Sequence, residues 1–302
     1  MARRHRKPSR LSPRARRTLM GLAMVLVLAP VAGVALGTAI EGANACSDKV
    51  ELTVAAAPEI APVLKTHAKQ QADKVTSEGI CVDATVVPAD SASMAVAMAE
   101  ANGSEIDVGD AAVEKVEIPD VWVPESTVWL TRLTGNLNGA LDERIDSVAE
   151  APVGLAIKHG EADQETGVSL TSTDVATSDP RSDAASMAVY LASSTNKGVS
   201  LTSNPDGAKV MSQTALTQHN KNSDEKLMFV EPFPQLAPFE YPYVPYNTET
   251  ADLQAATDAF RSSLLSNGFS NILASNGLRS PSPYLEFPDA DSVDEALKAY
   301  KK

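Results

Sequence analysis

The sequence holds few of the residues, and none of the motifs, on which catalysis commonly depends. It has two cysteines and four histidines in 302 residues, and only 5% of its residues are aromatic. It contains no G-x-S-x-G elbow, H-E-x-x-H helix, glycine-rich phosphate loop or complete dinucleotide fingerprint. We therefore expect a binding protein that is not an enzyme and needs no cofactor or metal. His67, His159 and His219 are interpreted as surface or satisfied side chains.

The scarcity of cysteine leaves few uses for the two that are present. Neither Cys46 nor Cys81 has a second thiol nearby in sequence, so a CxxC redox motif and a cysteine-rich metal site are excluded. Cys46 precedes the first predicted strand and Cys81 opens the second. We predict a disulfide between them, which would contribute about 3 to 4 kcal/mol by closing a loop of about 36 residues. Two free buried thiols are the alternative.

Acidic residues are absent from the first 17 residues, which carry eight Lys/Arg, and residues 18–40 have no charge. A basic flank before an apolar run keeps the N-terminus inside and sends the rest of the chain outside. An A-x-A cleavage pattern occupies residues 43–45, but the run is also long enough to span a bilayer. We predict an extracytoplasmic body preceded by a cleaved signal peptide or a transmembrane anchor in residues 1–45. A lipid-modified Cys46 is a third alternative.

Positive charge is scarce after residue 45. Residues 1–45 hold eight of the 26 Lys/Arg and one of the 39 Asp/Glu, so the remainder carries 18 bases against 38 acids, a net charge of −20. Such a surface repels nucleic acid and anionic lipid, and no basic stripe with interleaved aromatic residues occurs. We therefore exclude nucleic-acid binding. The acidity by itself is explained by solubility.

The sequence does contain a repeated pattern of strand, turn and helix. Four apolar runs lead into a turn and then a helix that opens on small or hydroxyl residues: LTVAAAPEIAP, ATVVPADSASMA, DVWVPESTVW and STDVATSDPRSDAAS. Each places unpaired backbone N–H groups and the positive end of a helix dipole at the carboxyl end of a strand. Open α/β sheets bind small ligands at such places, so the pattern indicates a capture site.

The alternation of strands and helices predicts an α/β fold with parallel strands. Prolines recur from Pro232 to Pro245 and predict extended crossing segments without a helix. The simplest architecture is a first lobe, 46–151 and 240–302, interrupted by a second lobe, 152–239. Strands are predicted at 52–56, 82–87, 121–123, 151–160 and 226–230, and helices at 60–75, 91–101, from 126, 183–192, 208–219, 249–265 and 293–300.

The order of these segments resembles the solute-binding domain of actinobacterial extracellular proteins with the type II periplasmic-binding-protein fold. The segments that carry the resemblance, over residues 46 to about 275, are LTVAAAPEIAPVL, GICVDATVVPADSASMA, PDVWVPESTVW, APVGLAI, SDPRSDAAS, MSQTALTQHN and FEYPYV. In that family a von Willebrand A domain with a D-x-S-x-S metal loop often follows. We expect no such domain in this sequence, because its nearest match to the loop, residues 90–93, has the wrong spacing.

The resemblance implies a two-lobed α/β fold in which a small ligand lies in a cleft that closes by hinge bending. Hydroxyl residues at helix starts are often ordinary caps, so only their convergence favours a site. Tyr241 and Tyr243, on the segment returning through the hinge, are further cleft candidates, whereas Trp122 is expected in the core. The implied ligand-binding residues are Ala57, Ser91, Ser93, Ser126 and Thr127 on the first lobe, and Ser178, Asp179, Arg181 and Ser182 on the second.

Two functions remain open at this level. The first is an extracytoplasmic solute-binding protein that serves transport or sensing, with a transporter permease as its partner. The alternative is a membrane-tethered cell-envelope adaptor that binds a protein, such as a von Willebrand A protein, or a cell-wall component. The class of the ligand is not predicted by the sequence.

Overall fold

The computed structural model describes residue 46 and residues 49–76, 79–134, 145–158, 168–196, 198–202 and 207–300. The chain divides into two compact units, Met1–Ser47 and Asp48–Lys302. The predictions for residues 1–45 and for His159 lie outside the described residues. Within the described part, no helix is both long and apolar enough to cross a bilayer. Cys46 and Cys81 are both disulfide-bonded, which confirms the predicted disulfide.

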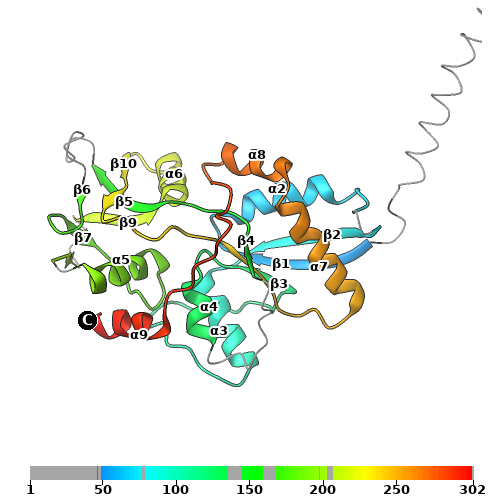
Figure 1. Ribbon diagram of the computed structural model, residues 1–302, viewed down its shortest axis with the longest axis horizontal. Helices are drawn as coiled ribbons and strands as arrows, with labels where there is room; N and C mark the ends of the chain where they lie inside the picture. The colour runs from blue at the N-terminus through cyan, green and yellow to red at the C-terminus, as the bar shows by residue number, and fades with distance from the viewer. Residues whose placement is uncertain are drawn as a thin grey trace, which may run out of the picture. The chain divides into compact units, whose positions relative to one another are not determined.

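The first sheet of the larger unit has five strands in the order β2-β1-β3-β12-β4. Strands β1, β2, β3 and β4 are labelled in Figure 1. Strand β1 pairs in parallel with β2 and β3, whereas β12 runs antiparallel to β3 and β4. The parallel arrangement predicted for the first three strands is confirmed. The strands are β1 (Lys49–Ala56), β2 (Cys81–Pro88), β3 (Val121–Val123), β4 (Asp146–Ser147) and β12 (Pro242–Pro245).

Alternation along these strands buries both faces of the first sheet. Val54 contributes to a core that includes α2 and α7, while the next residue, Ala55, contributes to a second core that includes α3 and α4. Trp122 belongs to that second core and is fully buried, as predicted. Successive side chains of a strand point to opposite faces, so one apolar run serves two layers of helix. The helices are α2 (Ala61–Gln71), α3 (Ser91–Ala101), α4 (Val128–Thr134), α7 (Ala251–Leu264) and α8 (Asn267–Ser275).

The second sheet has the strand order β10-β5-β9-β7-β8. Strand β5 pairs antiparallel with β9 and β10, while β7 pairs in parallel with β8 and β9. Two short strands, β6 (Val168–Ser169) and β11 (Pro232–Phe233), form a separate ladder. The elements are β5 (Val153–Lys158), β7 (Asp174–Ala176), β8 (Ser200–Thr202), β9 (Ala208–Ser212) and β10 (Leu227–Val230), with helices α5 (Ala184–Thr195) and α6 (Gln213–Asn222).

Two expectations about helices are corrected. The helix predicted at 208–219 begins only at Gln213, because residues 208–212 pair as β9 and the Ser212 hydroxyl caps the helix by accepting from Ala215 N. Helix α8 was not predicted; it starts directly after α7, where the Ser266 hydroxyl accepts from Phe269 N. The proline-rich segment contains no helix, as predicted.

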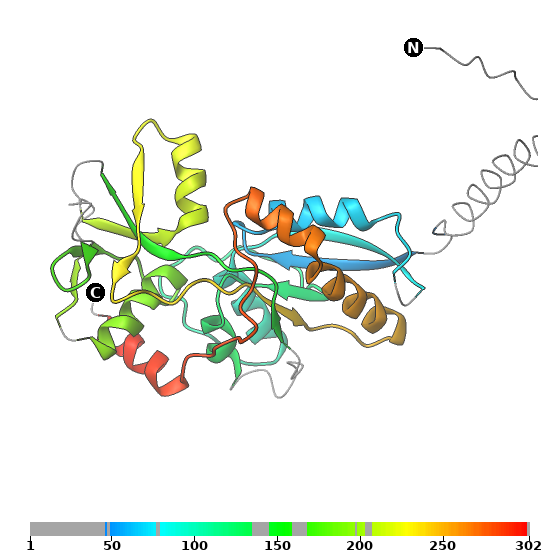
Figure 2. The same cartoon turned by 45° about the horizontal axis from the view of Figure 1, so that its top comes forward.

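The last helix, α9 (Ala290–Ala299), packs against α5 and α4 together (Figures 1 and 2). Val293 and Ala296 lie in one apolar cluster with Val128 of α4 and with Met187 and Tyr190 of α5. The C-terminal segment therefore joins helices that belong to different sheets. The lobe limits, 46–151 with 240–302 and 152–239, stay a prediction, and α9 contacts one helix from each of these two predicted parts.

Candidate functional site

The turns that follow β1, β2 and β3 lie at one edge of the first sheet, because the carboxyl ends of parallel strands share an edge. Asp90 caps α3 by accepting from Ser93 N at 2.8 Å and from the Ser93 hydroxyl at 2.9 Å. Glu59 and Glu125 each follow a proline at the end of β1 and β3. This edge therefore carries two carboxyl groups beside the predicted hydroxyls.

Glu59 connects the first sheet with the second. Its Oε2 accepts from the Ser212 hydroxyl, at the start of α6, at 2.5 Å and from the Tyr241 hydroxyl at 2.8 Å. Burial raises the pKa of Glu59, and the charge of Asp183 at the start of α5 adds to the rise. Tyr241 is fully buried and has φ of 44°, an uncommon conformation for a residue with a side chain. The returning segment is thus fixed at this carboxyl group.

Glu125 is held within the first lobe. Its Oε1 accepts from Trp129 Nε1 at 2.7 Å, and its Oε2 accepts from the Ser91 hydroxyl. Burial raises the pKa of Glu125 to about 7, and the nearby charge of Glu59 contributes to that rise. The carboxyl group therefore keeps its proton to a higher pH than an exposed glutamate does.

A cavity of about 630 Å³ lies between α5, the start of α4 and two extended segments. These are the crossing segment, residues 237–240, and the C-terminal segment, residues 282–289. We call it the interlobe cavity. Thr127 lies at its wall and donates its hydroxyl to the Glu286 carbonyl at 2.9 Å, and Oε2 of Glu240 is 3.4 Å from the same hydroxyl. Burial raises the pKa of Glu240 to about 7. The other lining residues include Ser126, Val128, Glu150, Ala184, Ala188, Leu191, Ser194, Phe239, Tyr284, Phe287 and Asp289.

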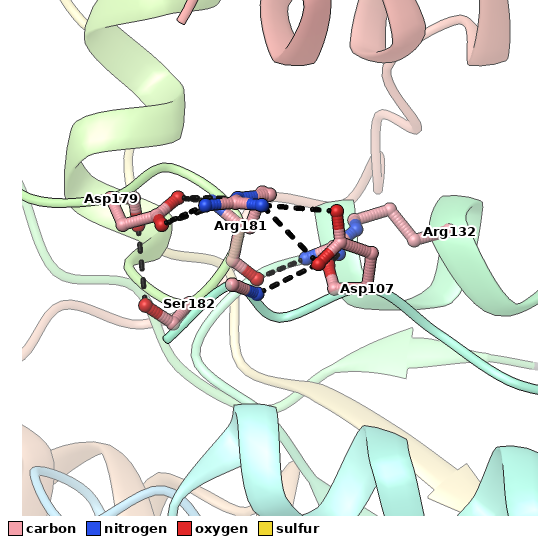
Figure 3. Close-up of polar contacts among 6 residues, drawn as sticks. Asp107, Arg132, Asp179, Arg181 and Ser182 are labelled. Carbon is pink, nitrogen blue, oxygen red and sulfur yellow. Dashed lines mark hydrogen bonds and ion pairs between the residues drawn. The ribbon is translucent and has the colours of Figure 1, made fainter. Parts of the chain in front are cut away.

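Arg181 is held in a separate ion-pair cluster (Figure 3). Its guanidinium binds Asp179 with Nε–Oδ1 at 3.0 Å and Nη2–Oδ2 at 2.6 Å, and binds Asp107 with Nη1–Oδ2 at 3.1 Å. Arg132 of α4 donates to the Arg181 carbonyl and to the Asp107 carbonyl, both at 2.6 Å. Burial lowers the pKa of Arg132 to about 10, which leaves it charged at neutral pH. These contacts fasten the loop before α5 to α4.

This cluster borders a second hollow of about 560 Å³ that also includes Glu105 and residues of α9. The Arg181 guanidinium carbon lies 5.7 Å from the centre of the Tyr300 ring, a cation–π distance. Three acidic and three basic residues line this hollow, and the arginines are already engaged by carboxylates and carbonyls. Both arginines of this hollow are therefore engaged by protein groups of the cluster.

The structure brings together only some of the predicted ligand-binding residues. Ser126 and Thr127 line the interlobe cavity, whereas Asp179 and Arg181 belong to the ion-pair cluster. The Ser182 hydroxyl donates to the Asp179 carbonyl at 3.3 Å.

The remaining predicted residues lie in the interior. Ala57 follows β1 and is buried in the core. The Ser91 hydroxyl donates to Glu125. The Ser93 hydroxyl donates to Asp90 and accepts from Glu114 N. Tyr243 is fully buried away from the cavity, and its hydroxyl donates to the Thr257 carbonyl at 3.0 Å. Tyr243 therefore fills the core near α7.

Sequence reasoning missed the carboxyl groups and the C-terminal segment. Glu59 and Glu125 did have a signal, a Pro-Glu pair that ends two of the repeated strand–turn segments. Glu240 and Tyr284 had none. The interpretation of His67 was incomplete, since its ring is 1% exposed, Nε2 lies 2.8 Å from the Ser263 hydroxyl, and burial lowers its pKa to about 4. Among the described residues, no group of three or more His, Cys, Asp or Glu is placed to hold a metal ion.

Comparison with solved structures identifies the fold. The sulfate-binding protein SubI from Mycobacterium tuberculosis H37Rv matches with a TM-score of 0.55 at 14% identity, over 84% of this chain and 92% of that chain. AfuA from Actinobacillus pleuropneumoniae, a periplasmic binding protein solved with exogenous fructose-6-phosphate, gives 0.53 at 12% identity, over 83% and 97%. A periplasmic thiamin binding protein gives 0.52 at 11% identity, over 86% and 99%. No protein-family model and no curated protein matches the chain. The chain has the two-lobed α/β fold of the type II periplasmic binding proteins.

Proposed function

We propose that this protein is an extracytoplasmic solute-binding protein, not an enzyme, that captures a small ligand between its two lobes and passes it to a transporter permease or a sensor. The observation that carries the proposal is the interlobe cavity. Its walls come from α5 beside the second sheet, from Ser126 and Thr127 after β3, and from the segment that crosses between the sheets. A ligand held there would contact both lobes at once, so binding and closure would be coupled.

The contacts between the lobes supply a closed state for such a cycle. Arg181 pairs with Asp107, and the Ser212 hydroxyl donates to Glu59, so these two polar contacts join the predicted lobes. The Asp107 side chain is 72% exposed, and the hydrogen bond to Glu59 is partly buried. Such contacts can be broken at modest cost, because each contributes about 1 kcal/mol.

Two features support an extracytoplasmic location of the protein. The basic segment followed by an apolar run indicates export, and the disulfide of Cys46 and Cys81 fits an oxidising compartment. We propose that residues 1–45 act as a signal peptide or membrane anchor. The structural neighbours are named for different ligands, sulfate, fructose-6-phosphate and thiamin, so the class of ligand has to be inferred from the cavity itself.

The test is a thermal-shift screen of residues 46–302 against oxyanions, sugars, amino acids, amines and cell-wall fragments. A ligand at a hundred times its dissociation constant stabilises the folded state by about 2.7 kcal/mol, a readable shift in melting temperature. Small-angle scattering with the best ligand should show a smaller radius of gyration if open molecules close on it. Absence of any stabilising solute across the panel would contradict solute capture.

The site residues can be tested in the same assay. Removing the Thr127 hydroxyl in Thr127→Val should weaken ligand binding by about 1 to 3 kcal/mol if the hydroxyl turns from Glu286 to the ligand. The matched control is Thr131→Val, because Thr131 also donates to the C-terminal segment, at the Pro288 carbonyl, but does not line the cavity. Equal affinities of the two variants would remove Thr127 from the proposed site.

A further inference from the structure

The charged residues that line the interlobe cavity have one sign. Glu150, Glu240, Glu286 and Asp289 are among its lining residues, with Glu286 and Asp289 exposed, and no Lys, Arg or His is among the described residues at its wall. The second hollow is different, because three basic residues line it beside three acidic ones, and Arg181 pairs with Asp107 there. The described residues of this wall therefore offer acidic side chains and no basic one, which favours a cation over an anion as the ligand.

Glu240 is the carboxyl group with the most to gain from a ligand. Its Oε2 lies 3.5 Å from Thr127 N and 3.4 Å from Thr127 Oγ1, both at the long limit for a hydrogen bond, and it also interacts with its own backbone N–H. The other acids are better occupied or more open. Glu150 accepts from Ser282 N at 2.7 Å, and Asp289 caps α9.

The rest of the wall is largely apolar. Ala184 and Ala188 of α5 are buried at one side, and Phe239 of the crossing segment is 4% exposed. On the C-terminal segment, Phe287 is 48% exposed and Tyr284 is 80% exposed, so both aromatic rings lie open at the rim. Aromatic faces attract cations and also cover apolar bodies.

We propose that the interlobe cavity binds an organic cation, with an ammonium group beside Glu240 and an apolar body against α5 and Phe239. The proposal rests on the solute-binding function and names the class of its ligand. An anion would find no basic side chain among the described residues of the wall, while a cation supplies the counter-charge for Glu240. The net charge of −20 after residue 45 favours the approach of a cation as well.

Three indole compounds that differ at one end test the proposal with the purified full-length protein. Tryptamine carries an ammonium group, tryptophol a hydroxyl group and indole-3-acetate a carboxylate. Isothermal titration at pH 7.5 should show tryptamine binding at least tenfold more tightly than either of the other two. Glu240→Gln should reduce tryptamine affinity about tenfold, to the level of tryptophol, because the amide keeps the shape but not the charge.

Three further variants control for misfolding and test the charge preference a second time. Glu105→Gln removes a carboxyl group from the second hollow and should leave tryptamine affinity unchanged. Ser194→Lys adds a positive charge at an exposed position on the cavity rim and should weaken tryptamine binding severalfold, while Ser194→Gln should not. Ligand-free melting curves of all variants show which of them are folded.

The outcomes separate this proposal from the broader one. If indole-3-acetate or tryptophol binds as tightly as tryptamine, or if Glu240→Gln and Ser194→Lys both leave the preference intact, the cation assignment is wrong and solute capture stands. Absence of binding by all three compounds overturns the cation assignment for this cavity. Solute capture itself fails only if the wider panel of oxyanions, sugars and other solutes is also without effect.

Discussion

Replacing Glu125 by glutamine should make the protein more stable at neutral and alkaline pH. The carboxyl group of Glu125 accepts from Trp129 Nε1 at 2.7 Å and from the Ser91 hydroxyl, and it is enclosed at the end of β3. A glutamine keeps an oxygen for Trp129, and its amide can donate to the Ser91 hydroxyl. The substitution therefore removes the charge and preserves the shape and the hydrogen bonds.

The magnitude follows from the pKa of Glu125, which burial raises from 4.5 to about 7. Below pH 4.5 the group is protonated in both the folded and the unfolded chain and makes no difference to stability. Between pH 4.5 and 7 the unfolded chain releases the proton and the folded chain retains it, so the free energy of unfolding falls as pH rises. A shift of this size corresponds to about 3 kcal/mol, which Glu125→Gln should recover at high pH.

Chemical denaturation of the parent and the variant at pH 4.5, 6 and 8 measures this effect. The variant's gain over the parent should grow by about 2 to 3 kcal/mol from pH 4.5 to pH 8. Taking the difference between the two proteins cancels the titrating groups that do not interact with Glu125, such as His67. Glu100→Gln, on the exposed side of the α3 helix that begins at Ser91, is the matched control and should follow the parent. A variant gain that is the same at every pH would refute the assignment of a raised pKa to Glu125.

Three other variants test separate parts of the fold. Cys81→Ser should lower the free energy of unfolding by about 3 to 4 kcal/mol in denaturant titrations, and a non-reduced digest of the parent should contain the linked peptides, so equal stability of the two would contradict a structural disulfide. Arg181→Ala should break the ion pairs with Asp107 and Asp179 and enlarge the ligand-free radius of gyration in scattering, whereas an unchanged radius would show that these pairs do not hold the lobes together. Val293→Ala should lower the free energy of unfolding by about 1 to 3 kcal/mol, since Val293 of α9 is 2% exposed and packs against α4 and α5. A smaller loss in denaturant titrations would mean that α9 is loosely docked.

Local patterns predicted the first half of the fold well. The bounds of β3 and α3 match the prediction, because Val121–Val123 is a short apolar run and Asp90 supplies an N-cap before a helix of small and apolar residues. The start of α6 was wrong because residues 208–212 have no strong period of their own. They form a strand only because β5 and β7 pair with them on either side, and that pairing is invisible locally.

The candidate site shows the same division between local and distant causes. Ser126 and Thr127 could be predicted, since a hydroxyl after an apolar strand is a local signal. The ligand class that we propose depends instead on Glu240 and on the residues near Tyr284, which are distant in sequence from Thr127 and from each other. Neither segment has a sequence pattern that predicts a place in the cavity wall. Both contain prolines and are extended, and their positions depend on the elements that they pack against. A hydroxyl at a helix start occurs in ordinary caps and in binding sites alike, so it does not define a ligand. The charges that remote segments place beside it would decide which solute the protein binds.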